Sequence, residues 1–155
     1  MPGKTGLRPG PKTLVLRCQT CDAIDAPRVT GKALVCKQPI SFLGQIDPGS
    51  GKAQEGLSIS GCSVRDRILV YPTGAGSTVG SLVILNLKMH GNAPKGIINQ
   101  EMDTVVLSGA IWADIPVAHR FERGLDPTEV IETGDSVTIL GKEKKIMVTK
   151  GADGH

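Results

Sequence analysis

Aromatic residues are scarce in this sequence, with one Trp, one Tyr and two Phe among 155 residues. Proteins that bind single-stranded nucleic acids need flat rings on which bases stack, so the composition argues against that function. No apolar run approaches the roughly 18 residues that span a bilayer, and the first six residues lack the apolar stretch of a secretion signal. We therefore expect a cytoplasmic protein with an aliphatic core that binds neither nucleic acid nor membrane.

A second pair of cysteines, which a typical zinc or iron–sulfur motif requires, is also missing. Cys18 and Cys21 form a CxxC sequence, but only the scattered Cys36 and Cys62 follow. A bound metal and a redox pair are open alternatives, although no strand–CxxC–helix pattern surrounds the motif. The simplest interpretation is four reduced thiols, and we expect no metal site in this chain.

The length allows one compact domain with a real core. Residues 1–11 are rich in Gly, Pro, Lys and Arg and are expected to be flexible. We place a single domain over residues 12–150 and a disordered tail over residues 151–155. The net charge of +3 comes largely from lysines and arginines near both ends, which we interpret as solvated flanks.

Short apolar segments alternate with turns rich in glycine and proline. Residues 79–90 are apolar on nearly all sides, which predicts a buried helix with Ser77 or Thr78 as its N-cap. A second helix is expected over 103–113, capped by Asp103 or Thr104. The order of elements predicts a mixed α/β fold, a small barrel-like sheet with flanking helices. The expected strands cover residues 12–17, 31–36, 67–71, 95–99, 115–118, 136–140 and 145–149, the last two forming a hairpin.

The strongest local signal for chemistry is the Gly-rich segment 72–81, which lies between a predicted buried strand and the predicted helix. Its glycines let the backbone approach a ligand, and free N–H groups at a helix start favour carboxylate or phosphate. Ser77 could be held by these donors and act as an alkoxide-like base; alternatively, Ser77 only caps the helix. The segment lacks the lysine of a P-loop, and its spacing fits neither a dinucleotide fingerprint nor a nucleophile elbow.

Three other polar residues are candidates by type alone. His90 falls in the last turn of the predicted helix and His119 follows a predicted strand, so structural roles are expected for both. Asp47 lies in the long polar segment 45–61, but acidic residues in Asp-Pro-Gly sequences usually stabilise turns. None of the three outweighs Ser77 as a candidate catalytic group.

Two motifs together connect the sequence with a known family. They are Ser41-Phe42-Leu43-Gly44 and Gly76-Ser77-Thr78-Val79-Gly80-Ser81, and neither alone would be specific. In this combination the chain resembles the small subunit of the aconitase X family, which includes archaeal phosphomevalonate dehydratases and bacterial cis-3-hydroxy-L-proline dehydratases. The resemblance covers roughly residues 28–140. Further matching segments are 31–35, 39–44 with Asp47, 68–70, 91–98 and 109–116.

The resemblance implies a swivelling β/β/α domain that works with a separate large subunit, whose cysteines carry an iron–sulfur cluster. It implies a hydro-lyase that is inactive without that subunit and acts on a small substrate with a carboxylate. The length of the chain favours cis-3-hydroxy-L-proline over (R)-5-phosphomevalonate as that substrate. The family's proton acceptor maps onto Ser77. Residues that would stabilise the serine oxygen or bind the substrate are Gly76, Thr78, Val79, Gly80, Ser81 and Ser41.

A different class of function fits the same residues. A non-enzymatic module could use the Gly-rich turn to bind an anionic ligand or a partner. Such a module would bind its ligand as an isolated chain, whereas the dehydratase would need its second subunit.

Overall fold

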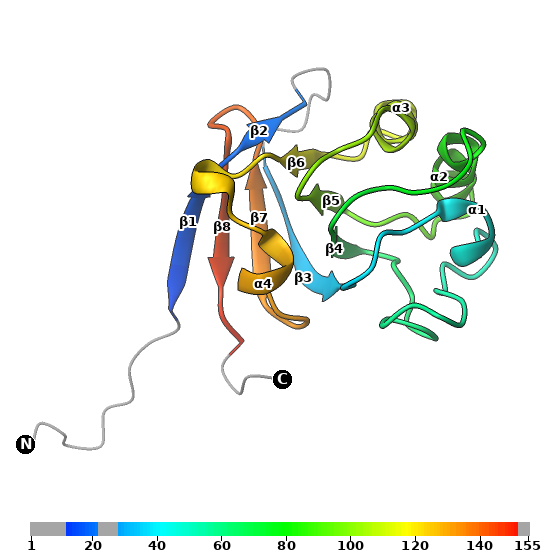
Figure 1. The fold of residues 1–155 in the computed structure, drawn as a ribbon, viewed down its shortest axis with the longest axis horizontal. Helices are drawn as coiled ribbons and strands as arrows, with labels where there is room; N and C mark the ends of the chain where they lie inside the picture. Colours follow the sequence, from blue (N-terminus) through cyan, green and yellow to red (C-terminus); the bar gives the residue numbers. More distant parts are fainter. Residues whose placement is uncertain (1–11, 22–27, 152–155) are drawn as a thin grey trace, which may run out of the picture.

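An eight-stranded mixed sheet forms the centre of the computed structural model, with helices packed against it (Figure 1). The structure describes residues 12–21 and 28–151. The expectations for residues 1–11 and for residues 152–155 fall outside these ranges. No helix in the described ranges combines the length and the apolar character that crossing a membrane requires.

Most of the predicted elements are present, with small differences at their ends. The elements that the sequence did not predict are short, because a pair of strand residues or a single helical turn leaves no periodic pattern. The strands are β1 (Thr13–Arg17), β2 (Gln19–Thr20), β3 (Val29–Val35), β4 (Arg67–Tyr71), β5 (Gly96–Asn99), β6 (Val117–His119), β7 (Ser136–Leu140) and β8 (Lys145–Thr149). The helices are α1 (Phe42–Gln45), α2 (Gly80–Met89), α3 (Thr104–Trp112), the 3-10 helix η2 (Glu122–Gly124) and α4 (Pro127–Val130).

The strand order is β1-β8-β7-β3-β4-β5-β6-β2. The four central strands β3, β4, β5 and β6 run parallel, and the outer strands pair antiparallel. β1 and β2 stand at opposite ends of this order, yet Cys18 alone separates them in the chain. In a flat sheet these edges would lie roughly 30 Å apart. The sheet therefore curls until its edges meet, which confirms the predicted barrel-like sheet.

Two hydrophobic clusters lie on the two faces of the sheet. One fills the inside of the curled sheet and includes Ile68 and Val70 of β4. The other lies between the sheet and α1, α2 and α3, and it includes Leu69 and Tyr71 of the same strand. The alternation follows from the two-residue period of a strand, and both faces of β4 are covered, as is usual for central parallel strands.

Two predictions for α2 are wrong. Its N-cap is Val79 instead of Ser77 or Thr78, and no side chain caps it. Nor is the whole helix buried, because Leu82 is 50% exposed and Met89 is 74% exposed. A sequence pattern reports how apolar a helix is, but it does not report which of its sides the same chain covers.

The start of α3 is as predicted. Asp103 is its N-cap, and the Asp103 carboxylate accepts the Val106 N–H at 2.7 Å. Capping is a local interaction within one turn of helix, so the sequence contained the whole signal.

Candidate functional site

The loops that follow β3 and β4 lie side by side at the carboxyl edge of the parallel strands. The Ile40 N–H donates to the Thr73 carbonyl at 3.2 Å, and the Ala75 N–H donates to the Ile40 carbonyl at 2.9 Å. Figure 1 shows the two loops, cyan and green, running from the sheet toward α1 and α2. Crevices at the carboxyl ends of parallel strands are the usual ligand sites of open α/β sheets.

Gly76 lies directly against Ser41, so the two sequence motifs meet in space. The φ angle of Gly76 is +87°, in the left-handed region that favours glycine. A Cβ at this position would lie 2.9 Å from the Ser41 Cβ and closer still to its hydroxyl. The Ser41 hydroxyl donates to the Leu43 carbonyl at 3.1 Å, which orients it within the loop. The structure thus brings Ser41, Gly76 and the adjoining Ser77 to one place.

Ser77 is exposed in this Gly-rich turn. Its Oγ accepts the Val79 N–H at 3.1 Å, and within residues 12–21 and 28–151 its hydroxyl proton has no acceptor. In the same ranges the amides of Gly76 and Thr78 also have no hydrogen-bond acceptor. Donors directed at an oxygen favour its negatively charged form. The Val79 N–H is directed at the Ser77 oxygen, and the amides of Gly76 and Thr78 are left to donate to an anionic group beside the turn.

The last residues of the motif turn inward. Gly80 is buried, and a Cβ there would lie 3.4 Å from Val105 of α3. Ser81 is also buried, and its hydroxyl donates to the Thr78 carbonyl at 3.1 Å. Val79 is exposed but offers only an apolar side chain. Substrate binding by Gly80 and Ser81 stays a prediction that this geometry does not favour.

Three residues that follow β5 support the turn, and no sequence motif connects them with it. The amides of Gln100 and Glu101 donate to the Pro72 carbonyl at 2.9 and 3.2 Å. The Asp103 carboxylate occupies the space beside Gly74, where a Cβ would lie 2.8 Å from the Asp103 Cγ. The available signal was their position in the chain. Because β4 and β5 are parallel neighbours, the segments that follow them lie at the same carboxyl edge of the sheet.

Comparison with known proteins identifies the family. Residues 19–148 match the family model of the aconitase X swivel domain. The chain belongs to this family. It is 48% identical over 124 residues to the phosphomevalonate dehydratase small subunit of Archaeoglobus fulgidus, over 79% of this chain and 92% of that protein. The corresponding protein of Methanosarcina mazei is 42% identical over 126 residues, 81% of this chain and 86% of that protein.

A solved structure agrees with this assignment. The crystal structure of Thermococcus kodakaraensis aconitase X in its holo-form is similar with a TM-score of 0.79 and 34% sequence identity, over 87% of this chain and 98% of that chain. The likeness confirms the predicted swivelling domain. Because the match to the family model runs from β2 into β8, the swivel domain includes both loops that meet at Ser77.

The two histidines and Asp47 have structural partners in the swivel domain. The Nδ1 atom of His119 accepts the Met102 N–H at 3.0 Å, and burial lowers the pKa of His119. The Nδ1 atom of His90 lies 2.8 Å from a backbone carbonyl one turn earlier in α2. Hydrogen bonds from the Ser50 hydroxyl and from a neighbouring amide lower the pKa of Asp47. These contacts agree with the structural roles that the sequence indicated.

All four cysteines of the chain are free thiols. The part of the chain that the structure describes holds no group of three or more His, Cys, Asp or Glu side chains that could bind a metal ion. Cys18 lies where the two edges of the sheet meet, and burial raises its pKa to about 12. Such a thiol is protonated at neutral pH and is a poor nucleophile. This burial argues against a reactive redox pair with Cys21.

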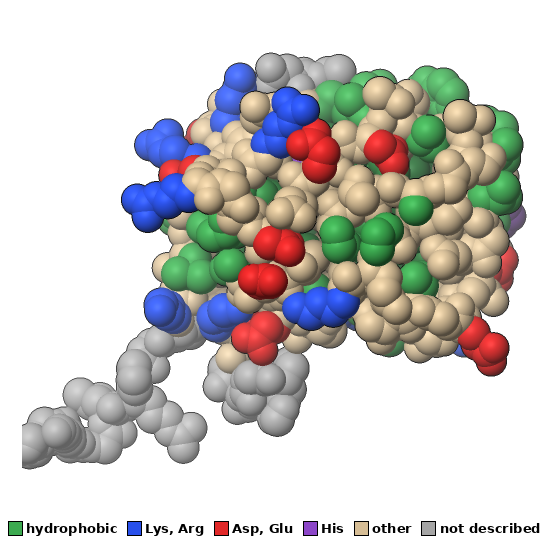
Figure 2. All heavy atoms as spheres, in the orientation of Figure 1, with side chains coloured by type: hydrophobic (Ala, Val, Ile, Leu, Met, Phe, Trp, Pro, Cys, Tyr) green, Lys and Arg blue, Asp and Glu red, His purple; other side chains and the backbone are tan. Residues whose placement is uncertain are grey.

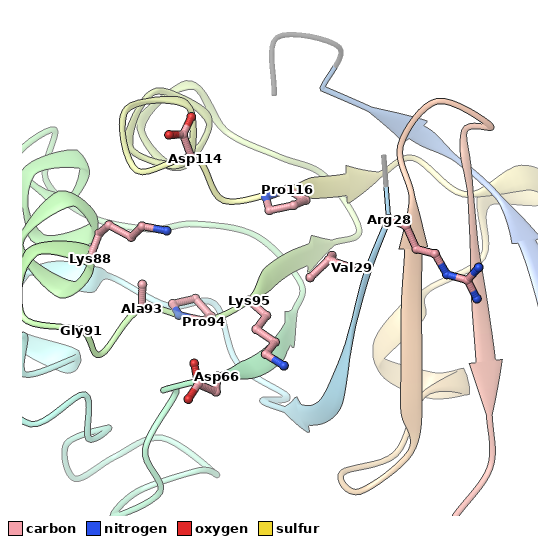
Figure 3. Close-up of a pocket in the computed structure, with 10 residues that line it drawn as sticks. All are labelled: Arg28, Val29, Asp66, Lys88, Gly91, Ala93, Pro94, Lys95, Asp114 and Pro116. Carbon is pink, nitrogen blue, oxygen red and sulfur yellow. The ribbon is translucent and has the colours of Figure 1, made fainter. Parts of the chain in front are cut away.

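A pocket of about 400 Å³ lies at the other edge of the sheet (Figure 3). Arg28, Asp66, Lys95 and Pro116 line it, and each directly precedes one of the parallel strands. The pocket is therefore at the amino edge, whereas Ser77 follows β4 at the carboxyl edge. Its lining carries charges of both signs, with three basic side chains and two acidic ones. It is separate from the serine turn.

Proposed function

We propose that this chain is the small subunit of a phosphomevalonate dehydratase, in which Ser77 is the general base. The observation that supports the proposal is the exposed Ser77 hydroxyl, whose oxygen accepts the Val79 N–H in a turn at the carboxyl edge of the sheet. A general base needs access to a substrate and a donor that favours its deprotonated oxygen, and these two features of Ser77 support the role.

The proposed reaction removes water from two adjacent carbons of the substrate. Ser77 takes the proton as the C–H bond breaks, the electron pair forms the double bond, and the hydroxyl leaves the neighbouring carbon. An iron–sulfur cluster carried by the large subunit would supply the Lewis acid for that leaving hydroxyl. The amides of Gly76 and Thr78 are suited to bind a carboxylate oxygen of the substrate beside the serine. The small subunit thus contributes the base, and the large subunit completes the site.

We place phosphomevalonate before cis-3-hydroxy-L-proline as the substrate. The relatives from Archaeoglobus fulgidus and Methanosarcina mazei are named for phosphomevalonate, and they match most of both chains. The preference for hydroxyproline depended on chain length, which reports nothing about the residues at the site. A substrate screen of the reconstituted enzyme with both compounds decides between them.

Replacement of Ser77 by Ala tests the base. In the complex with the large subunit, we expect the kcat of S77A for phosphomevalonate to fall at least about 100-fold, with little change in KM, because proton transfer loses its acceptor. Ser60→Ala is the matched control, since Ser60 is exposed in a different loop. Turnover of S77A within a few-fold of the unmodified complex would contradict the proposed role.

The non-enzymatic alternative is tested in the same preparation. The amides beside Ser77 would also suit a module that only binds an anion. That module would bind phosphomevalonate as the isolated chain and would give no turnover when the large subunit is added. Calorimetry of the isolated chain and an activity assay of the complex distinguish the two functions.

A further inference from the structure

The helices α1, α2 and α3 share an apolar outer face. It consists of side chains that are at least one third exposed in this chain, although they are large and hydrophobic. Figure 2 shows hydrophobic side chains gathered over α3 and α2 at the upper right of the molecule. We call this surface the apolar helix face, and its residues are Leu43, Val79, Leu82, Met89, Ile111 and Trp112.

The apolar helix face lacks the charges that a solvent-facing helix normally carries. The sequence of α3 contains no charged residue, and that of α2 contains Lys88 alone. Surface helices usually place charged and polar residues opposite their buried stripe. On the exposed side of α2, the N-cap Val79, Leu82 and Met89 follow one another at helical spacing, with Asn86 as the polar residue between Leu82 and Met89. Both helices have the composition of helices that are covered on all sides.

The apolar helix face extends to the serine turn. Val79 is two residues from Ser77, and its N–H is the donor to the serine Oγ. The start of α2 touches the other two helices, because a Cβ on Gly80 would lie 3.8 Å from the Phe42 Cβ and 3.4 Å from Val105. A partner that covers this face therefore reaches the edge of the proposed catalytic site.

We infer that the apolar helix face is the docking surface for the large subunit, an inference that rests on the proposed function. The partner surface would be apolar and poor in charge, to match the face. A stable interface buries about 800 Å² per partner, so the contact has to extend beyond these six side chains, and the neighbouring serine turn is the adjoining surface. A second copy of this chain on the same face would cover Val79 and obstruct Ser77, which makes it the less suitable occupant.

Two substitutions on the face test the docking surface. Leu82→Glu and Trp112→Glu each place a carboxylate at a side chain that is 50% or 56% exposed in the isolated chain, so the fold is expected to tolerate them. We expect each to raise the dissociation constant for the large subunit from the same organism by about 30-fold or more. A loss of affinity of this size is typical of a central interface residue. If circular dichroism shows that Leu82→Glu is not folded, Leu82→Gln replaces it in the binding measurement.

Val15→Glu is the matched control, because Val15 is 51% exposed on β1, away from the three helices. We expect it to leave the dissociation constant within threefold of the unmodified chain. The inference is overturned if the Leu82 and Trp112 variants bind the large subunit as tightly as Val15→Glu does. It is also overturned if Leu82→Glu breaks up a dimer of this chain that the large subunit does not displace.

The binding measurement is independent of the catalytic proposal. S77A retains the whole apolar helix face, so we expect it to bind the large subunit normally while it loses turnover. Normal turnover of S77A together with weak binding of Leu82→Glu would contradict the base and support the docking surface. Loss of turnover in S77A together with normal binding of Leu82→Glu would support the base and contradict the docking surface.

Discussion

Two glycines of the serine turn, Gly74 and Gly76, leave space that side-chain oxygens occupy. The hydroxyl of Ser41 lies against Gly76, and the carboxylate of Asp103 lies against Gly74. From the sequence alone, these glycines indicated close approach of the backbone to a ligand. The structure gives them a second purpose, because a side chain at either position would displace a residue that supports the turn. The position of Ser77 therefore depends on residues that are far from it in the chain.

Gly76→Ala tests this dependence at the scale of single residues. The new Cβ would collide with Ser41 and would also strain a residue at positive φ. We expect kcat/KM of the reconstituted enzyme to fall about 100-fold, because small misplacements of catalytic groups have effects of that size. Gly56→Ala is the control, since Gly56 has a φ of +95° but nothing within 4 Å of its Cβ position.

The two Gly→Ala variants are compared by urea unfolding as well. Gly56→Ala is expected to lower the free energy of unfolding by about 1 kcal/mol through backbone strain alone, and to leave activity unchanged. Equal activity losses in the two variants would show that strain, and not the contact with Ser41, is the cause.

At the scale of elements, α2 and α3 form one layer that packs very closely. A Cβ on Gly109 of α3 would lie 3.0 Å from the Ser81 Cα and 2.9 Å from the nearest atom of Ile84. The prediction of helices over residues 79–90 and 103–113 was right, and so was the prediction of Asp103 as an N-cap. The prediction that α2 is buried on all sides was wrong for this chain, and the exposed side is the apolar helix face.

Gly109→Ala tests the close packing of the two helices. Alanine is favoured over glycine in helices by about 1 kcal/mol, but overpacking costs about 1–3 kcal/mol. We therefore expect the free energy of unfolding to fall by about 1 kcal/mol, measured by urea denaturation. Ser108→Ala, on the neighbouring and more open position of α3, should be neutral or slightly stabilising. A more stable Gly109→Ala chain would mean that the helices can separate without loss.

At the scale of the molecule, the end of the described chain is attached to the loop before β7. The Lys150 Nζ atom lies 2.9 Å from the Asp135 carboxylate. The same carboxylate accepts hydrogen bonds from the backbone N–H groups of Glu132 at 2.8 Å and Gly151 at 3.1 Å. Burial alone would raise the pKa of Asp135, but these hydrogen bonds and the Lys150 charge together hold it below its ordinary value. A carboxylate with a lowered pKa stabilises the fold above the pKa of the unfolded chain, near 4.

Asp135→Asn therefore changes the pH dependence of stability. In the unmodified chain this contribution is present at pH 7 and is lost as the pH falls below about 4. We expect the substitution to lower the free energy of unfolding by about 1–2 kcal/mol at pH 7 and by less at pH 3. Urea denaturation at both pH values measures the difference. Asp66→Asn is the control, because Asp66 forms an exposed ion pair with the adjacent Arg65. If Asp135→Asn lowers the free energy of unfolding equally at both pH values, the lowered pKa of Asp135 is contradicted.

The sequence by itself determined the features that depend on neighbouring residues. The alternating apolar segments predicted the strands, Asp103 predicted the start of α3, and the two short motifs indicated the family. Each of these signals lies within a few residues, because strand alternation, capping and turn chemistry are local interactions.

Only the tertiary structure decided which distant residues share a site or a surface. It closed the sheet at Cys18 and brought Ser41 against Gly76. It also left one side of an apolar helix uncovered, at Leu82 and Met89. The physical reason is that packing depends on the direction and register of whole elements, which residues far apart in the chain set together.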